Sequence, residues 1–588
     1  MTEDLVAALA AIGIMVLPLA EVVLRRFFNT GVPGAAPFTS HLTLVVGLIG
    51  ASIAAREGKL LALATGTMVP EGRPRHLAGI LAAFVAALVT TILALGGVRL
   101  LQVHYAAGKE IALGVPTWVA DLTFPIAFGL IALRLVWKSS PIMIGRALAA
   151  LGIVAGAWMS THPELLLDQS GWPWIAILVG AAILGMPIYA FIGGAAVILF
   201  LVQGDSPANA IIGSYDQLTS TDLPAIPLFT LAGFLLAEGR ASDRLLRLFR
   251  AFFGWAPGGT AVVTTILCAF FTLLTGGSGV TILALGGLLM PALIADGYSE
   301  RFSLGLLTAA GSLGLLFPPS LPLILYGIVA EVPIGDLFIG GFLPGTLMLG
   351  ALAALGVREG LVNGSAQRPF TFREAIAATW SAKWELLLPV VIVVSLLAGA
   401  TTVQSAALAA LFTLVVQRFI HRDLATFGDL RRAMSRSIAL VGGILIILAV
   451  AVGLTTYLID AQVPARLAEW AKENIHSKWL FLLGLNAFLI VVGGMMDIFS
   501  AIIVVVPLIV PIAMHFQVHP IHLGIIFIAN SELGYLTPPV GENLFVASYR
   551  FNKPILELAR AMLPMYVILL IGVLLITYLP WLTTGLLK

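Results

Sequence analysis

The sequence predicts an all-α polytopic membrane protein whose larger part is an inverted repeat with two re-entrant hairpins and two broken helices. Three observations lead to this fold class. Of the 588 residues, 59% are hydrophobic and only 11% are charged, whereas about a quarter of the residues of a soluble domain are charged. The dipeptide Pro-Pro occurs twice, in matching surroundings. Two long apolar stretches are each interrupted near the middle by glycines.

The two Pro pairs indicate the repeat. They lie in Leu313–Ser320 and Leu533–Val540, which are 220 residues apart and share Leu, Gly and Pro at equivalent places. A Pro pair removes two backbone donors and clashes with the preceding turn, so both segments are expected to be broken helices. The same offset separates further prolines, Pro291 from Pro511 and Pro344 from Pro564. This regularity predicts an internal repeat.

The first part of the chain is expected to be a separate membrane unit. Apolar spans of helix length fall near residues 5–23, 42–55, 78–103 and 118–137, and a fifth lies near 142–160. We therefore predict a four-helix membrane domain at 1–140, a connecting helix and loop at 141–165, and a large domain at 166–588. Basic residues cluster after the second and fourth spans, which predicts a cytoplasmic N-terminus.

In the large domain, three further spans near 172–186, 188–203 and 224–238 lead to a basic amphipathic helix at Arg240–Arg250. Two hairpins follow, Thr260–Ala295 and Trp479–Met514, broken at Gly276 and Gly494. Their arms of about 16 residues are short for a full crossing, which favours re-entrant hairpins.

Five spans separate the two hairpins, near 302–331, 338–357, 386–399, 403–420 and 437–459. Because five is odd, equivalent segments enter from opposite sides and the repeats are inverted. We place repeat 1 at about 171–357, repeat 2 at about 384–588, and the transport core at 259–345 and 479–564.

The predicted core contains no fixed cation. Neither 259–300 nor 479–549 includes a Lys or Arg, so an anionic ligand would depend on open helix N-termini. Hydroxyls and carboxylates at the breaks, such as Ser278, Thr537 and Asp497, are hard oxygen ligands that suit sodium. Two alternatives remain: Ser278 and Thr275 could bond back within their helices, and Asp497 could lie at a water-exposed tip.

Glu532 and Glu542 flank the second Pro pair, and each could carry a proton or only line the opening. A membrane-embedded enzyme or redox-pump subunit is a third hypothesis. Against it, the sequence has no His-Glu-x-x-His motif and no Cys cluster. It also lacks a Walker-type loop and a basic stripe for nucleic acid. We therefore expect no organic cofactor and no nucleic-acid partner.

Motifs in both halves carry a family resemblance. They are Ile226–Phe229, Gly276–Gly279, Leu313–Ser320, Phe342–Gly345, Gly493–Asp497, Pro507, Pro511, His519–Gly524 and Leu533–Leu544. In this order they resemble the large membrane subunit of tripartite ATP-independent periplasmic (TRAP) transporters. Residues 1–140 resemble the small subunit of that family, and 142–160 resembles the helix that fuses the two subunits in single-chain versions.

The resemblance implies a secondary active importer of organic acid anions, carboxylates or sulfonates, driven by a sodium gradient through an elevator mechanism. Its implied partners are a periplasmic substrate-binding protein and membrane lipids. The chain would be a monomer with both subunits in one polypeptide, and not an enzyme, in a bacterial inner membrane. A proton-coupled or binding-protein-independent anion transporter of similar architecture is the alternative.

Carried over residue by residue, the resemblance implies two or more sodium sites and a substrate site between them. The expected sodium-binding residues are Thr275, Gly276, Ser278, Gly314, Pro318, Gly494, Asp497, Gly534 and Thr537. The expected substrate-binding residues are Ser278, Gly279, Ser320, Asp497 and Asn543.

Overall fold

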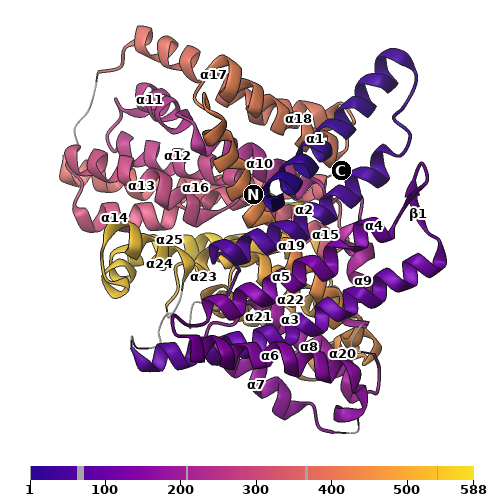
Figure 1. Ribbon diagram of the computed structural model, residues 1–588. Helices are drawn as coiled ribbons and strands as arrows, with labels where there is room; N and C mark the ends of the chain where they lie inside the picture. The colour runs from indigo at the N-terminus through magenta and orange to yellow at the C-terminus, as the bar shows by residue number, and fades with distance from the viewer. Residues whose placement is uncertain are drawn as a thin grey trace. The chain divides into compact units, whose positions relative to one another are not determined.

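A computed structural model describes residues 2–62, 70, 72–167, 169–206, 209–364, 369–538 and 541–587. Within these residues, 13 helices are long and apolar enough to cross a membrane. The prediction of an all-α polytopic membrane protein is therefore confirmed. The chain forms two compact units, one of Met1–Leu228 with Met434–Leu467 and one of Phe229–Ala433 with Ala468–Lys588 (Figure 1).

The first unit begins with the helices that the hydrophobic pattern predicted. They are α1 (Thr2–Phe28), α2 (Ala35–Glu57), α3 (Arg73–Ala107), α4 (Trp118–Asp121), α5 (Thr123–Lys138) and α6 (Met143–Thr161), with a short hairpin of β1 (Glu110–Ala112) and β2 (Val115–Pro116). Helix α6 packs very closely on α3, because a Cβ on Gly152 would lie 2.2 Å from the carbonyl oxygen of Phe84. Small residues allow such contacts between membrane helices.

The rest of the first unit comes from two distant parts of the sequence. Its elements are η2 (Pro163–Leu166), α7 (Trp172–Ile183), α8 (Ile188–Val202), α9 (Asn209–Leu218), the start of α10 (Ala225–Glu238) and most of α19 (Phe427–Asp460). Helix α9 was not predicted, because Asn209, Asp216 and Gln217 make its ten residues too polar to look like a span. Gly442 of α19 lies against α2, where its added Cβ would be 2.6 Å from the Cα of Gly50.

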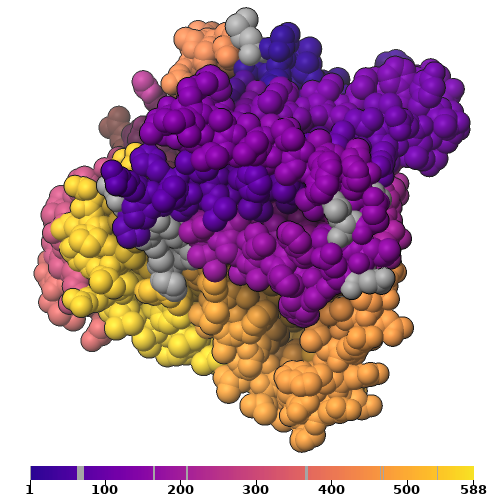
Figure 2. Space-filling model, turned by 60° about the horizontal axis from the view of Figure 1, so that its bottom comes forward, coloured from indigo at the N-terminus to yellow at the C-terminus, as the bar shows by residue number. Residues whose placement is uncertain are grey.

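The second unit repeats one order of elements. The first series is α12 (Gly259–Thr275), α13 (Ser278–Ala295), α14 (Glu300–Ala310), η3 (Leu313–Leu316), α15 (Leu321–Val329) and α16 (Ile334–Asn363). The second series is α21 (Lys478–Met495), α22 (Ile498–His515), α23 (Pro520–Gly534), α24 (Glu542–Phe551) and α25 (Ile555–Tyr578), followed by α26 (Trp581–Thr584). Each series contains a helix pair, a broken helix and a long helix. In the space-filling view the yellow C-terminal end of the second series forms part of the visible surface (Figure 2).

The breaks fall where the sequence placed them. Gly276, with φ of 69°, separates α12 from α13, and α22 begins directly after Asp497. The first Pro pair follows η3, and the two arms of its helix are bent by 46°. The second broken helix is interrupted after Gly534. Prolines and glycines thus end the helices as expected from their backbone chemistry.

The remaining helices of the second unit are α11 (Ala241–Phe253), α17 (Phe372–Leu397), α18 (Thr402–Val415), the π-helical turn η4 (Val416–Ile420) and part of α20 (Val463–Asn474). Helix α11 is the amphipathic helix that the sequence predicted, and Arg244 fixes it in place. The Arg244 guanidinium lies 2.6 Å from a carboxylate oxygen of Glu385 on α17 and 2.8 Å from one of Asp423. Burial lowers the pKa of Arg244, but Asp423 and Glu385 outweigh burial and raise it above its ordinary value.

Candidate functional site

The first break is held by direct backbone packing. A Cβ on Gly314 of η3 would lie 2.3 Å from the carbonyl oxygen of Ala269 on α12. A Cβ on Gly276 would lie 2.4 Å from Cδ1 of Leu321, which follows Ser320 at the start of α15. The structure therefore brings the predicted residues Gly276, Gly314 and Ser320 into one junction between the first helix pair and the first broken helix.

Two hydroxyls at this junction are buried without a hydrogen bond. Ser278 is 2% exposed and Ser320 is fully buried, and the Oγ of each has no partner among the described residues. An unsatisfied buried polar group costs roughly 1–3 kcal/mol, so a ligand that both hydroxyls bind would remove that cost. Thr275 differs, because its Oγ1 donates to the carbonyl oxygen of Phe271 at 3.0 Å. The helical back-bond that the sequence left open thus occurs at Thr275 and not at Ser278.

Pro318, the remaining residue of the first predicted sodium set, lies between η3 and α15 and is half-buried. It follows Phe317, the C-cap of η3, and precedes Ser320 by two positions. Proline leaves its carbonyl oxygen as a backbone acceptor while lacking a backbone N–H donor. Pro318 therefore adds a backbone carbonyl, and no N–H, to the segment between η3 and α15.

The second break is built around four glycines. A Cβ on Gly534 would lie 2.5 Å from the carbonyl carbon of Gly493, and a Cβ on Gly494 would lie 3.4 Å from the carbonyl oxygen of Thr537. The N–H of Gly541 donates to the carbonyl oxygen of Gly494 at 3.2 Å. Three residues of the second predicted sodium set, Gly494, Gly534 and Thr537, therefore lie together. The Thr537 hydroxyl itself donates to the carbonyl oxygen of Leu533 at 2.8 Å.

Asp497, the fourth residue of that set, is the N-cap of α22. Its Oδ1 accepts hydrogen bonds from the N–H groups of Phe499 and Ser500, both at 3.0 Å, and its Oδ2 accepts the Ser500 hydroxyl at 2.5 Å. The carboxylate is half-buried and bonded to its own helix, and not a free tip in water. The N–H of Ile498 donates to the Tyr535 hydroxyl at 2.8 Å, which joins the second helix pair to the second broken helix.

Helix α24 connects the two breaks. A Cβ on Gly279 would lie 3.1 Å from Cγ2 of Val546 and 3.4 Å from Oε1 of Glu542. Asn543 is fully buried, and its Nδ2 donates to the carbonyl oxygen of Thr308 at 3.2 Å. Its Oδ1 meets no hydrogen-bond donor within the described part of the chain. Gly279 and Asn543 of the predicted substrate set therefore lie on elements that meet.

Glu542 on α24 lies close enough to Asp497 for the charges of the two carboxylates to interact. Glu542 also lies near the Tyr535 hydroxyl. No hydrogen bond joins Asp497 to the Ser278 hydroxyl among the residues that the structure describes. The predicted residues thus form two junctions, one at each break, with α24 between them.

Glu532 on α23 carries a buried carboxylate. It is 1% exposed, and neither of its oxygens has a hydrogen-bond partner in the described chain. A carboxylate at such depth requires a proton or a bound cation.

A buried polar network was missed by the sequence analysis. Asn530 Nδ2 donates to Asn486 Oδ1 at 2.6 Å, and the Thr577 hydroxyl donates to the same oxygen at 3.0 Å. These side chains join α21, α23 and α25. The sequence did contain a signal for this network, because Asn486 is a lone amide in an apolar helix. In membrane proteins, polar side chains within such helices often form contacts between helices or take part in function.

Comparison with known proteins gives the family. Residues 175–582 match the profile described as "Tripartite ATP-independent periplasmic transporter, DctM component". Residues 14–140 match "Tripartite ATP-independent periplasmic transporters, DctQ component". The chain belongs to the tripartite ATP-independent periplasmic transporter family and carries both membrane components in one polypeptide.

Two relatives illustrate the likeness. The "Isethionate TRAP transporter permease protein DctMQ" of Oleidesulfovibrio alaskensis is 32% identical over 80% of this chain and 75% of its own. The "C4-dicarboxylate TRAP transporter large permease protein DctM" of Pseudomonas aeruginosa is 34% identical over 66% of this chain and 90% of its own. A crystal structure of the Alcanivorax borkumensis YdaH transporter aligns with a TM-score of 0.47 and 17% identity, over 64% of this chain and 88% of that one.

Family membership decides whether this membrane protein is a transporter or an enzyme. The protein is a multi-pass transporter of a bacterial inner membrane and not an enzyme. The hypothesis of a membrane-embedded enzyme or redox-pump subunit is therefore wrong.

Proposed function

We propose that this protein imports organic acid anions, carboxylates or sulfonates, together with sodium ions, and receives them from a periplasmic substrate-binding protein. The relatives described above are named for isethionate, a sulfonate, and for C4-dicarboxylates. The observation that carries the proposal is the junction at the first break. There the Ser278 and Ser320 hydroxyls are buried without hydrogen-bond partners among the described residues. Neither 259–300 nor 302–357, the stretches that contain them, includes a Lys or Arg.

Sodium would supply the positive charge that the protein lacks. The oxygens of Ser278 and the carbonyls around Gly314 and Pro318 would hold one ion, and Asp497 with the backbone around Gly494, Gly534 and Thr537 would hold another. The N-terminus of α13 would face the anion, because free N–H groups and the helix dipole favour negative charge there. At α22 the first N–H groups already donate to Tyr535 and Asp497. Each element lies at a break, where backbone groups are not consumed by helical hydrogen bonds.

The proposed movement is an elevator. Gly314 packs on Ala269 and Gly534 packs on Gly493 with almost no space between the backbones, so each broken helix would move together with its helix pair. Tight interlocking of this kind resists sliding, since packed interiors are not continuously deformable. In this proposal the helix pairs are re-entrant, the repeats are inverted and the N-terminus is cytoplasmic.

The inverted arrangement can be tested with single cysteines after replacing Cys268 with Ala. Asp296 is a poor position, because it is buried and accepts a hydrogen bond from the Thr260 hydroxyl. Ala295 and His515 are exposed at the ends of α13 and α22. We expect Ala295→Cys and His515→Cys to react with a membrane-impermeant reagent from opposite faces of the membrane. Labelling of both in intact spheroplasts would make the repeats parallel.

Coupling is tested by uptake into proteoliposomes that contain the full chain, with labelled isethionate or succinate and the binding protein. We expect uptake to require an inward sodium gradient and the binding protein. If the sodium ions that enter carry more charge than the anion, net positive charge moves inward. An inside-negative potential then favours uptake by about 2.3 kcal/mol per net charge per 100 mV. Full uptake driven by a proton gradient without sodium would contradict the proposal.

Proton coupling is a second candidate, favoured by the Glu532 carboxylate, which has no hydrogen-bond partner among the described residues. Glu532→Gln keeps the size of the side chain and removes its titration. If protons are co-transported at this position, the variant loses the stimulation of uptake by an inward proton gradient. If sodium alone is coupled, the variant keeps the sodium curve of the parent protein.

A further inference from the structure

A pocket of about 530 Å³ lies where α14 and α25 begin, within the roughly 300–1,000 Å³ of small-molecule sites. The two helices touch beside it, because a Cβ on Gly305 would lie 2.5 Å from the carbonyl oxygen of Ala561. The pocket belongs to the second unit. Its lining residues are Glu300, Arg301, Leu304, Pro554, Leu556, Glu557, Arg560 and Ala561.

The carboxylates of this pocket are already paired with a cation. Lys553 Nζ lies 2.9 Å from Oε1 of Glu300 and 3.4 Å from Oε1 of Glu557. Hydrogen bonds to Glu300 and Glu557 raise the pKa of Lys553 above its ordinary value, so its ammonium group stays charged at neutral pH. One lysine therefore holds both carboxylates and joins the first turn of α14 to the first turn of α25.

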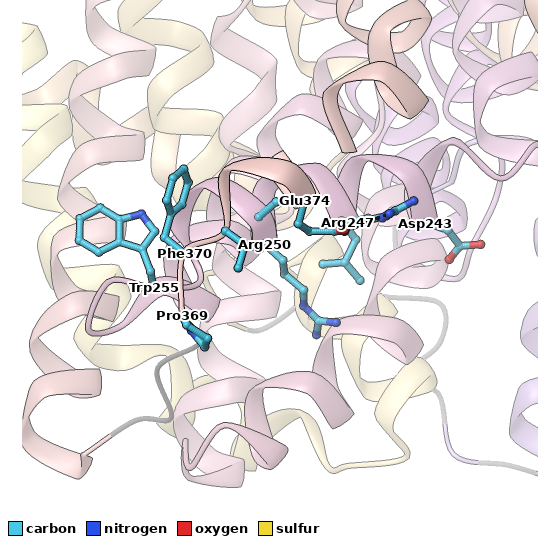
Figure 3. A pocket seen from close by; sticks show the side chains of 10 residues that line it. Asp243, Arg247, Arg250, Trp255, Pro369, Phe370 and Glu374 are labelled. Carbon is cyan, nitrogen blue, oxygen red and sulfur yellow. Dashed lines mark hydrogen bonds and ion pairs between the residues drawn. The ribbon is translucent and has the colours of Figure 1, made fainter. Parts of the chain in front are cut away.

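The two arginines of the pocket are not paired in this way. Arg301 Nη2 donates to the backbone carbonyl oxygen of Arg560 at 3.2 Å, which brings the two residues together. Both are exposed, and neither guanidinium has a carboxylate partner among the described residues. A pocket at α11 shows the contrast, because there Arg247 donates to both carboxylate oxygens of Glu374, at 2.7 and 3.1 Å (Figure 3). The planar donor groups of Arg301 and Arg560 can therefore take a phosphate.

An apolar stripe runs from the pocket along α25, a helix of membrane-spanning length. Leu556 and Arg560 of the lining share one helical face with Leu563, Val567 and Ile571, because these positions recur at intervals of three and four residues. The last three are 57%, 48% and 53% exposed. A cationic pocket at one end of an exposed apolar stripe fits a phospholipid whose phosphate enters the pocket and whose acyl chains follow the helix.

We propose that the pocket between α14 and α25 binds the headgroup of an anionic phospholipid such as phosphatidylglycerol. The phosphate accepts charge-assisted hydrogen bonds from Arg301 and Arg560. Phosphatidylethanolamine and phosphatidylcholine also carry a phosphate, but their ammonium groups would place a positive charge beside the two arginines. The carboxylates that could bind that charge already face Lys553. The glycerol headgroup is uncharged, so phosphatidylglycerol avoids this repulsion.

The test uses the purified full chain in nanodiscs of equal parts phosphatidylglycerol, phosphatidylethanolamine and phosphatidylcholine, with retained lipid counted by native mass spectrometry. We expect retained phosphatidylglycerol to exceed the other two lipids. Arg301→Gln and Arg560→Gln should each lower its retention about tenfold, the loss of one charge-assisted hydrogen bond. Arg560→Lys should lower it less, because lysine keeps the charge without the planar donors. Arg466→Gln, the same change at an exposed arginine of α20, should have no effect.

Four results would overturn the proposal. One is equal retention of the three lipids by the parent protein. Another is equal retention of phosphatidylglycerol by Arg560→Gln and Arg466→Gln, with melting temperatures showing that both variants are folded. A third is stabilisation by soluble glycerophosphoglycerol or inorganic phosphate as large as that by the lipid, which would make the site one for a soluble phosphate compound. The fourth is a dimeric mass in place of bound lipid, which would assign the apolar stripe to a second copy of the chain.

Discussion

The two helix breaks of the second unit have the same architecture but satisfy their polar groups differently. At the first break, the Ser278 hydroxyl is buried and has no hydrogen-bond partner among the described residues. At the second break, Asp497 accepts three hydrogen bonds from its own helix. A ligand could therefore add interactions to the first break, whereas the second break is already stabilised without one.

What the two breaks share is contact between backbones. Gly314 at the first break and Gly534 at the second have no room for a Cβ. We infer that glycine packing maintains both breaks, and that the polar residues at the tips differ in how far they contribute to stability. This difference can be tested by substitutions at each break.

The largest effect is expected from Gly534→Ala. The new Cβ would lie 2.5 Å from Gly493, so two backbones must separate, which costs about 1–3 kcal/mol or more. The variant should lose most of its uptake and melt at a lower temperature in detergent. Gly484→Ala on α21, the helix that carries Gly493, is the control, because its added Cβ would meet no neighbouring atom of the described residues within 4 Å. Equal melting temperatures for the two variants would show that the close packing of Gly534 on Gly493 does not stabilise the second break.

Asp497→Ala should have an intermediate effect with two components. Loss of the N-cap should cost about 1 kcal/mol, seen as a lower melting temperature, and loss of an oxygen ligand should raise the sodium concentration for half-maximal uptake. Asp497→Ser separates the components, because serine also caps helices. It should restore the melting temperature but not the sodium affinity. Recovery of both would show that Asp497 is only a cap.

Ser278→Ala should have the smallest effect on stability. Its hydroxyl makes no hydrogen bond to a described residue, so its removal breaks no such bond. Relief of the unsatisfied buried group and the cost of the small void left behind oppose each other, and the net change in the free energy of unfolding should be small. Half-maximal uptake should nevertheless require more sodium. A clear drop in melting temperature with an unchanged sodium dependence of uptake would contradict this prediction. It would mean that Ser278 stabilises the fold and does not bind sodium.

The sequence predicted the elements well and their contacts poorly. Apolar length and the Gly and Pro breaks placed the helix pairs and both broken helices, because these signals are local. The polar helix α9 was not predicted, because the sequence of its ten residues resembles a loop as much as a membrane span. The domain limits and the sodium and substrate residues stay predictions.

The contacts depend on residues far apart in the chain. Nothing near Asn543 indicates that its amide reaches the carbonyl of Thr308, or that Gly279 faces Glu542. The same holds for the ion pair between Arg244 and Glu385, which are 141 positions apart. Such pairs are fixed by tertiary packing, which one sequence does not specify locally.

The central claim is that both breaks bind sodium, and equilibrium binding of ²²Na⁺ to the purified full chain tests it without a substrate or a binding protein. The account predicts saturable binding to the parent protein, weaker binding to Ser278→Ala and to Asp497→Ser, and the weakest binding to the double variant. Absence of saturable binding, or the same isotherm for the parent protein and the double variant, would contradict it.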